Sequence, residues 1–205
     1  MKTFGRVLTA MITSFNEDGS VNIENSVAIA EHLLNHGSDG LVVCGTTGEN
    51  PTMSRESKIA LFKAIAKACG DKGTIIANVG SNDTKGSVDF VKEVSTIPGI
   101  DGLLVVVPYY NKPNQQGQYL HFKSIAEATT LPIMVYYVHS RVGTSIFPAT
   151  LARLHKEYPH ICAIKEASGN LMIASEIKRL MPGEDFMVYS GDDGLTLPIL
   201  SVGGT

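Results

Sequence analysis

Short apolar runs alternate with longer amphipathic segments along this chain, and the alternation constrains the fold more than any other feature. Seven runs rich in Val, Ile and Leu lie at 7–13, 40–45, 74–79, 102–108, 132–138, 162–167 and 186–191. Most of them are continuously apolar, which is typical of parallel strands that are covered on both faces. Amphipathic helical patterns occupy the intervals, at 22–36, 54–69, 84–97, 117–129, 147–158 and 169–180. The pattern predicts βα units that feed a parallel sheet.

Residues suited to helix ends stand at several of the predicted boundaries. Gly37 and Gly70 follow the helical segments 22–36 and 54–69, where glycine often ends a helix, and Ser54 opens the second of them as an N-terminal cap. The residues at these helix ends therefore support the helices that the hydrophobic periodicity predicts.

Two architectures use such units, the doubly wound sheet and the (β/α)₈ barrel. None of the apolar runs is followed by GxGxxG or GxxxxGK[ST], which disfavours a dinucleotide-binding fold. We therefore predict an α/β fold and favour the (β/α)₈ TIM barrel. Because only seven strand runs occur, the chain is either a barrel truncated after the seventh strand, with the eighth strand absent, or an open or shortened version. No Pro-, Gly- or Ser-rich linker divides the 205 residues, so a single domain over 1–205 is expected. An open barrel exposes two strand edges, and aggregation or domain swapping is expected of it in isolation.

Composition excludes several classes of partner. The formal net charge is -3, from 20 acidic and 17 basic residues without a long run of either sign, so we expect neither a nucleic-acid nor a membrane partner. No apolar stretch reaches the roughly 18 residues of a membrane span, and the N-terminal segment lacks the pattern of a signal peptide. Cys44, Cys69 and Cys162 include no CxxC pair and lie in apolar contexts, which indicates reduced, packed thiols. A cytoplasmic protein that acts on a small metabolite is predicted.

Polar residues collect where the predicted strands end. The segments are GTTGEN at 45–50, PYYNKP at 108–113, YYVHSR at 136–141, KE at 165–166 and SGDD at 190–193. Each of them alone has a structural explanation, as a glycine turn, an aromatic layer or a surface charge. Because the carboxyl ends of parallel strands meet at one rim, their joint occurrence favours a functional site there.

Lys165 lies inside the apolar run CAIKEASGN at 162–170. A strand lysine commonly extends its amine to solvent, whereas a lysine in an apolar pocket loses affinity for its proton and becomes an amine nucleophile. Strand alternation places Lys165 and Tyr136 on faces of adjacent strands where, if both faces point into a barrel, amine and phenol approach each other. A hydroxyl relays protons, and Arg141 at the rim suits a carboxylate, so a Schiff-base enzyme acting on a keto acid is indicated.

Four motifs together resemble the dihydrodipicolinate synthase family of pyruvate-dependent aldolases, to which N-acetylneuraminate lyase is related. They are GTTGEN at 45–50, PYYNKPNQQG at 108–117, Tyr136 with Arg141 five positions later, and IKEASGN at 164–170. The resemblance extends through the whole chain in order. It implies a (β/α)₈ barrel with a C-terminal helical extension, which these residues do not include, and a homo-oligomer, either a dimer or a tetramer.

The resemblance also implies roles for the residues around the lysine. Lys165 would form an imine with pyruvate, and Tyr136 would lie beside it. Thr46 would link Tyr136 to Tyr110, which a partner chain would contribute across the dimer interface.

Three further residues take binding roles under the same resemblance. Thr47 would bind the carboxylate of pyruvate, and Arg141 would bind the carboxylate of the second substrate, L-aspartate semialdehyde. Gly191 matches a glycine whose backbone lies close to the reacting groups.

The implied activity is that of a class I, Schiff-base lyase of lysine and diaminopimelate biosynthesis. It condenses pyruvate with L-aspartate semialdehyde to give 4-hydroxy-tetrahydrodipicolinate. Neither a metal nor an organic cofactor is implied, because the protonated imine withdraws the electrons.

The chain departs from the family pattern at the second-substrate side. Members usually have Tyr-Asn-x-Pro-x-Arg-Thr. In this chain Tyr137, His139 and Val142 replace the Asn, the Pro and the Thr of that pattern. Loss of the proline removes a fixed φ near Arg141, so we expect an altered aldehyde side and a retained pyruvate side. Lys58 and Gly86 stand where lysine-inhibited members have His and Glu, and weak or absent feedback by lysine is expected.

Two alternatives remain at this point. A sister aldolase for N-acetylneuraminate or a 2-keto-3-deoxy sugar acid would share Lys165 and Tyr136, although Arg141 and the pair Thr46-Thr47 favour the synthase. A catalytically decayed or truncated barrel is the second.

A metal enzyme is disfavoured. His32 and His36 have i, i+4 spacing on a predicted helix, but neither HExxH nor a third ligand accompanies them.

Overall fold

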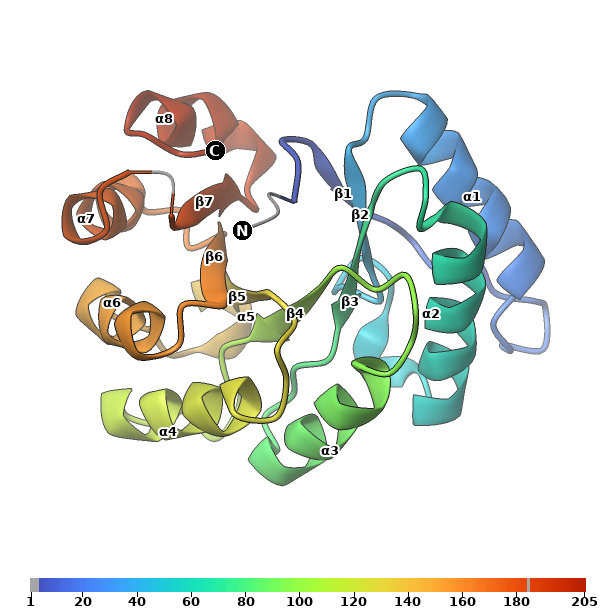
Figure 1. Cartoon of the computed structure of the whole chain (residues 1–205), viewed down its shortest axis with the longest axis horizontal. Helices are drawn as coiled ribbons and strands as arrows, with labels where there is room; N and C mark the ends of the chain where they lie inside the picture. Colours follow the sequence, from blue (N-terminus) through green and yellow to red (C-terminus); the bar gives the residue numbers. More distant parts are fainter. Residues whose placement is uncertain (1–3, 184) are drawn as a thin grey trace. The chain divides into compact units, whose positions relative to one another are not determined.

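The structure is a computed structural model that describes residues 4–183 and 185–205, and it confirms the predicted alternation of strands and helices (Figure 1). The strands are β1 Leu8–Ala10, β2 Gly40–Val43, β3 Thr74–Asn78, β4 Gly102–Val106, β5 Ile133–Tyr137, β6 Ile161–Glu166 and β7 Met187–Ser190. The α-helices are α1 Ile23–Asn35, α2 Arg55–Cys69, α3 Thr84–Val94, α4 Gln115–Ala126, α5 His139–Val142, α6 Pro148–Glu157, α7 Leu171–Leu180 and α8 Thr196–Ser201. Two 3₁₀ turns, η1 Asn50–Thr52 and η2 Asp193–Leu195, complete the described elements.

Contacts divide the chain into two compact units. The first contains the chain up to Val79 together with Lys92–Leu104, and the second contains Gly80–Val91 and Val105–Thr205. Of the three boundaries, one follows β3, one falls within α3 and one within β4. The single domain predicted over 1–205 stays a prediction.

Parallel strands form the interior of the first unit. β1 pairs with β2 and β2 with β3, in registers that align Leu8 with Gly40 and Gly40 with Thr74. Every residue of β2 and β3 is buried, which explains why both strands are continuously apolar in sequence. Ser54 caps α2 as predicted, since its side chain accepts a hydrogen bond from the backbone N–H of Ser57.

The two glycines that were predicted to end helices are required there for different structural reasons. Gly37 follows α1 with φ +107°, a conformation that favours glycine. Gly70 ends α2 with φ -66°, an ordinary helical value. A Cβ at Gly70 would lie 2.6 Å from the carbonyl oxygen of Ala66, so space rather than backbone freedom requires glycine there.

The second unit contains the parallel strands β5, β6 and β7. Its register places Lys165 of β6 beside Tyr136 of β5 and Tyr189 of β7. The pairing shifts between Ile133 and Met134, an irregularity that the strand pattern did not predict. Just after β4, the Val107 N–H donates to the Tyr136 carbonyl over 2.9 Å. The carboxyl ends of these strands therefore lie together at one edge of the unit.

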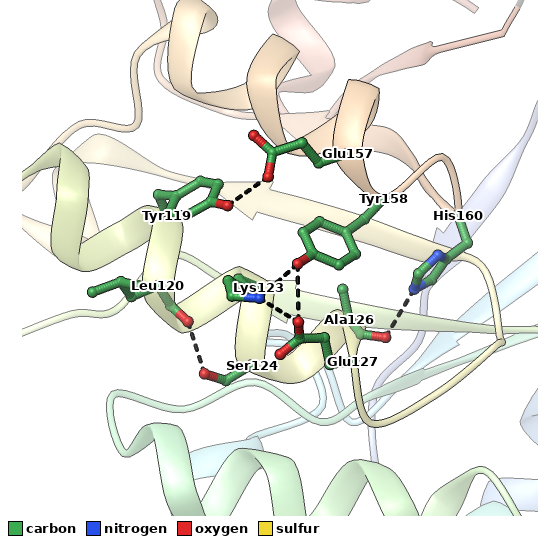
Figure 2. Close-up of polar contacts among 9 residues, drawn as sticks. All are labelled: Tyr119, Leu120, Lys123, Ser124, Ala126, Glu127, Glu157, Tyr158 and His160. Atoms are coloured by element: carbon green, nitrogen blue, oxygen red, sulfur yellow. Dashed lines mark hydrogen bonds and ion pairs between the residues drawn. The ribbon is translucent and has the colours of Figure 1, made fainter.

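Helices α4, α6 and α7 lie side by side outside β5–β7 (Figure 1). Figure 2 shows the polar contacts that join α4 to the end of α6. Lys123 Nζ donates to the Tyr158 hydroxyl over 2.8 Å, and that hydroxyl donates to Glu127 Oε1 over 3.0 Å. Lys123 also pairs with Glu127, and the Tyr119 hydroxyl donates to Glu157 Oε2 over 2.6 Å. Two tyrosine hydroxyls thus connect these helices.

The predicted elements differ from the observed ones mainly at their ends. The strand predicted at 7–13 is only Leu8–Ala10, and β2 stops before Cys44, whose φ of +55° is incompatible with a strand. Neither α5 nor α8 was predicted, because each is too short to show helical periodicity.

All three cysteines are free and buried, which confirms the predicted packed thiols. Burial raises the pKa of the Cys44 thiol to about 12 and that of Cys162 to about 11. Within the described ranges, no helix is both long enough and apolar enough to cross a membrane.

Candidate active site

Lys165 lies near the carboxyl end of β6, with its amine against an aromatic ring. Its Nζ is 4.9 Å from the centroid of the Tyr136 ring, on the neighbouring strand. An ammonium group at this distance from a ring face is attracted by the ring's electrons. The predicted approach of amine and phenol ring is confirmed.

Burial makes the ammonium form of Lys165 costly. Removal from water lowers the pKa of the Lys165 amine, and the negative charge of Asp193 only partly opposes that shift. Among the residues that the structure describes, no carboxylate forms an ion pair with this amine. A larger share of neutral amine at a given pH is the consequence, as an amine nucleophile requires.

Glu166 lies beside Lys165 in sequence but on the opposite face of β6, and it is fully buried. Its Oε1 accepts the backbone N–H of Ser168 over 2.9 Å, which holds the turn after the strand. Burial raises the pKa of this carboxyl group, although the hydrogen bonds from Ser168 oppose the shift.

Gly191 lies against the stem of Lys165. Its N–H donates to the Glu166 carbonyl over 2.7 Å, and a Cβ on Gly191 would lie 2.9 Å from both Cγ and Cε of Lys165. The same Cβ would also lie 2.9 Å from the Cβ of Ala167. Only a residue without a side chain leaves the lysine in this position.

Arg141 follows β5 on the single turn of α5. The turn ends at Gly143, whose φ is +68°. The Arg141 side chain is exposed, and its guanidinium has no hydrogen bond or ion pair to any described residue. All five of its N–H donors are therefore available to a ligand.

Tyr110 belongs to the same unit and projects into solvent. Its exposed fraction is 89%, and its φ of +67° is unusual for a tyrosine. The neighbouring Asn111 is held by two hydrogen bonds with Asn82, of 2.8 and 3.0 Å. The loop thus presents Tyr110 outward from an anchored base.

Thr46 and Thr47 lie in the first unit, in the turn that follows β2. Both are exposed, and the turn is closed by the bond from Glu49 N–H to the Thr46 carbonyl, 3.1 Å long. Asn78 Nδ2 donates to the Cys44 carbonyl over 2.7 Å, which fixes the start of the turn. The relay predicted between Thr46 and Tyr110 stays a prediction.

Sequence reasoning did not foresee one polar cluster beside the site. Tyr137, His139 and Ser145 form a hydrogen-bonded triangle at the base of α5, with His139 as its first residue. The unusual residues at 137 and 139 were its only sequence signal.

His32 and His36 stack with ring centroids 4.0 Å apart, and His36 Nδ1 is 2.7 Å from the His32 carbonyl oxygen. No group of three or more His, Cys, Asp or Glu residues suited to a metal occurs within 4–183 and 185–205.

A parallel α/β fold with a desolvated lysine at a strand end defines the class of lysine-dependent, Schiff-base aldolases. Comparison with known proteins specifies the family. The model of the Dihydrodipicolinate synthetase family matches residues 3–205. The chain belongs to the dihydrodipicolinate synthetase family, which confirms the family predicted from the four motifs.

Named relatives agree with that assignment. The 4-hydroxy-tetrahydrodipicolinate synthases of Desulforamulus reducens and Moorella thermoacetica are 51% and 52% identical to this chain, each over 98% of it. The alignments cover 67% and 68% of those two proteins, so the chain spans about two thirds of their length. These names support the predicted synthase function, and neither protein is named as a sugar-acid aldolase.

Solved structures agree as well. A dihydrodipicolinate synthase of Bacillus anthracis has a TM-score of 0.95 and 42% identity, covering 100% of this chain and 69% of its own. The Cyanidioschyzon merolae enzyme, solved with lysine bound, has a TM-score of 0.94 and 44% identity over 98% of this chain and 68% of its own. The Acinetobacter baumannii enzyme, complexed with pyruvate, has a TM-score of 0.93 and 34% identity, covering 98% of this chain and 68% of its own. The predicted parallel α/β fold is thereby confirmed.

Proposed function

We propose that this chain carries the Schiff-base centre of a lyase that condenses pyruvate with L-aspartate semialdehyde to 4-hydroxy-tetrahydrodipicolinate. The observation that carries the proposal is the Lys165 amine, which is desolvated, free of ion pairs to described residues, and 4.9 Å from the Tyr136 ring centroid. The names of its relatives support the same reaction.

The chemistry begins with the neutral amine of Lys165. Its nitrogen attacks C2 of pyruvate, the carbonyl oxygen leaves as water, and a protonated imine remains. Loss of a proton from C3 moves an electron pair into the C2–C3 bond and gives an enamine. C3 then attacks the aldehyde carbon, whose oxygen takes up a proton and becomes a hydroxyl group. Finally the amine of the second substrate adds to C2 and displaces Lys165, which closes the ring.

Proton transfers in this sequence need a hydroxyl group beside the amine. Tyr136 is adjacent to Lys165 by strand register, and we assign it the role of proton carrier. Thr46 and the Tyr110 of a second copy would extend the relay, and the 89% exposure of Tyr110 suits a residue that acts in another protomer. The functional protein is then a homo-oligomer, a dimer or a tetramer.

The two carboxylates are assigned to different groups. Thr47 holds the carboxylate of pyruvate, and Arg141 holds that of L-aspartate semialdehyde by paired N–H donors. Gly191 leaves room for the imine beside Lys165. The reaction needs no metal or organic cofactor, because the iminium itself withdraws electrons.

The remaining parts of the proposal concern the whole protein. The strands described here belong to a (β/α)₈ barrel, and the enzyme works in the cytoplasm in lysine and diaminopimelate biosynthesis. The three free, buried cysteines support a reducing compartment, and the pathway follows from the proposed product.

Incubation with pyruvate and borohydride tests the central step. Borohydride reduces the imine to a stable secondary amine, so the intact mass should rise by one reduced pyruvate and the modified peptide should contain Lys165. Lys165→Arg should abolish the adduct, whereas Lys156→Arg, a change at an exposed lysine of α6, should not. Folded wild-type protein that forms no adduct would overturn the proposal.

A further inference from the structure

The segment that carries Arg141 is closed at its base by side-chain hydrogen bonds that join Tyr137, His139 and Ser145. Tyr137, the last residue of β5, is 1% exposed, and its hydroxyl donates to Ser145 Oγ over 2.9 Å. His139 Nδ1 lies 3.2 Å from the Tyr137 hydroxyl and 3.2 Å from Ser145 Oγ. Three side chains from the two ends of a short loop therefore meet around one point.

Helix α4 holds the same loop from the other side. Gln115 Nε2 and Gln118 Nε2 donate to the Ser145 carbonyl over 2.6 and 3.0 Å. Gln115 Oε1 accepts from the N–H of Phe147 and from Thr150 Oγ1, over 2.9 and 2.7 Å. Ser145 is thus fixed through both its hydroxyl and its backbone.

The only helix between Tyr137 and Ser145 is α5, a single turn that begins at His139. One turn has little stability of its own, because nucleating a helix costs more entropy than its first bonds return. The Arg141 guanidinium forms no hydrogen bond or ion pair with the described residues. The direction of its guanidinium therefore depends on the anchors at Tyr137, His139 and Ser145.

We propose that the Tyr137–His139–Ser145 triangle is a positioning device for Arg141 and sets the affinity of the site for the aldehyde substrate. The inference rests on the proposed function, in which Arg141 binds the carboxylate of that substrate. Paired recognition of a carboxylate by guanidinium requires a fixed direction, and a loosened loop must be ordered again at each binding event. Pyruvate reacts on β6 at Lys165, so its affinity does not depend on the triangle.

An assay that does not depend on turnover can measure the binding of each substrate separately. Succinate semialdehyde carries the carboxylate and the aldehyde but no amine, so its condensation product cannot displace Lys165 and stays attached as an imine. Borohydride then traps either the pyruvate adduct or the heavier condensation adduct, and intact mass distinguishes them. Varying each compound in turn yields a half-saturating concentration for pyruvate and one for the aldehyde.

Tyr137→Phe and Ser145→Ala each remove the shared hydrogen bond while leaving most of the packing in place. We expect either change to raise the half-saturating aldehyde concentration about fivefold to tenfold, as loss of one hydrogen bond predicts, with the value for pyruvate unchanged. The double variant should lose less than the sum of the two single losses, because the Tyr137–Ser145 hydrogen bond is removed by both changes. Tyr158→Phe, the same change on the α6 side of the unit, should alter neither value.

Two results would overturn the positioning role alone: equal changes in the half-saturating concentrations of pyruvate and aldehyde, or an unaltered half-saturating aldehyde concentration in both variants. A wild-type protein that forms no pyruvate adduct, or whose adduct never accepts the aldehyde, would overturn the proposed function and this inference with it. Thermal unfolding of each variant, followed by circular dichroism, verifies that the values come from folded protein.

Discussion

At the scale of single residues, the surroundings of Lys165 decide what its amine does. An ordinary strand lysine keeps its charge in water, whereas burial lowers the pKa of this one. In the window between its folded pKa and the ordinary value of about 10.4, the unfolded chain binds more protons than the folded chain. The free energy of unfolding therefore rises with pH through this window, and burial of the amine costs most stability below it.

Lys165→Met should remove that cost. We expect the variant to melt about 2–4 °C higher than wild type at pH 7, equivalent to about 1 kcal/mol for a chain of this size. The advantage should shrink as the pH rises toward the ordinary lysine pKa of about 10.4, because removing the proton from the amine then costs less free energy. Circular dichroism melts at pH 7 and 9.5 measure both values, and an advantage that grew with pH would contradict the proposed desolvation.

Gly191→Ala tests the space beside the same lysine. The new Cβ would lie 2.9 Å from atoms of Lys165 and of Ala167, so one of them must move. We expect the rate of pyruvate trapping to fall about tenfold or more and stability to fall by about 1–3 kcal/mol.

Gly194→Ala is the matched control, because its Cβ would meet only Asp192 Oδ1 at an ordinary 3.4 Å. The rate of pyruvate trapping, followed by intact mass, compares the Gly191→Ala and Gly194→Ala variants. Equal rates in both variants would show that Gly191 is not required for lysine placement.

At the scale of elements, the polar network between α4 and α6 shows how helices are held outside the strands. The Tyr158 hydroxyl lies between the ammonium of Lys123 and the carboxylate of Glu127 (Figure 2). The two charges pair with each other as well. An exposed ion pair contributes little to the free energy of unfolding by itself. Here the Tyr158 hydroxyl bonds to both charged groups of α4 and so links that helix to the end of α6.

Tyr158→Phe should therefore weaken the second unit without affecting its chemistry. Loss of the two hydrogen bonds should reduce the free energy of unfolding by about 0.5–1.5 kcal/mol, read from the urea midpoint. Pyruvate trapping should remain at the wild-type rate. An unchanged midpoint would mean that solvent replaces the hydroxyl at no cost.

At the scale of the whole molecule, the exposure of Tyr110 is the feature that calls for a second copy of the chain. Tyr110 is 89% exposed, has a left-handed backbone, and forms no side-chain hydrogen bond or ring contact with the described residues. Contact with another protomer would account for these properties.

A complementation experiment tests whether sites are shared. Lys165→Arg and Tyr110→Phe should each be inactive in condensation, but mixed dimers would contain one site with both native residues. Mixing equal amounts under subunit exchange should restore roughly a quarter of wild-type activity. Lys165→Arg mixed with Tyr136→Phe should restore nothing, since both residues belong to the same protomer's site. Recovery in neither mixture would place Tyr110 outside the partner's site.

Much of the fold follows from local sequence. Apolar runs and helical periodicity predicted each strand and long helix to within a few residues, because both signals depend on neighbours along the chain. Strand alternation also brought Lys165 and Tyr136 together correctly, as their register shows. The shift at Ile133 and the single turn of α5 escaped prediction, since neither leaves a periodic signal.

By itself, then, the sequence determined the order of the βα units, the lysine in its apolar strand and the family. Only the tertiary structure decided that Lys165 is desolvated, that Gly191 lies against its stem, and that Tyr137 reaches Ser145. The physical reason is distance along the chain. Burial and side-chain hydrogen bonds arise where separate segments meet, and no local pattern encodes which segments those are.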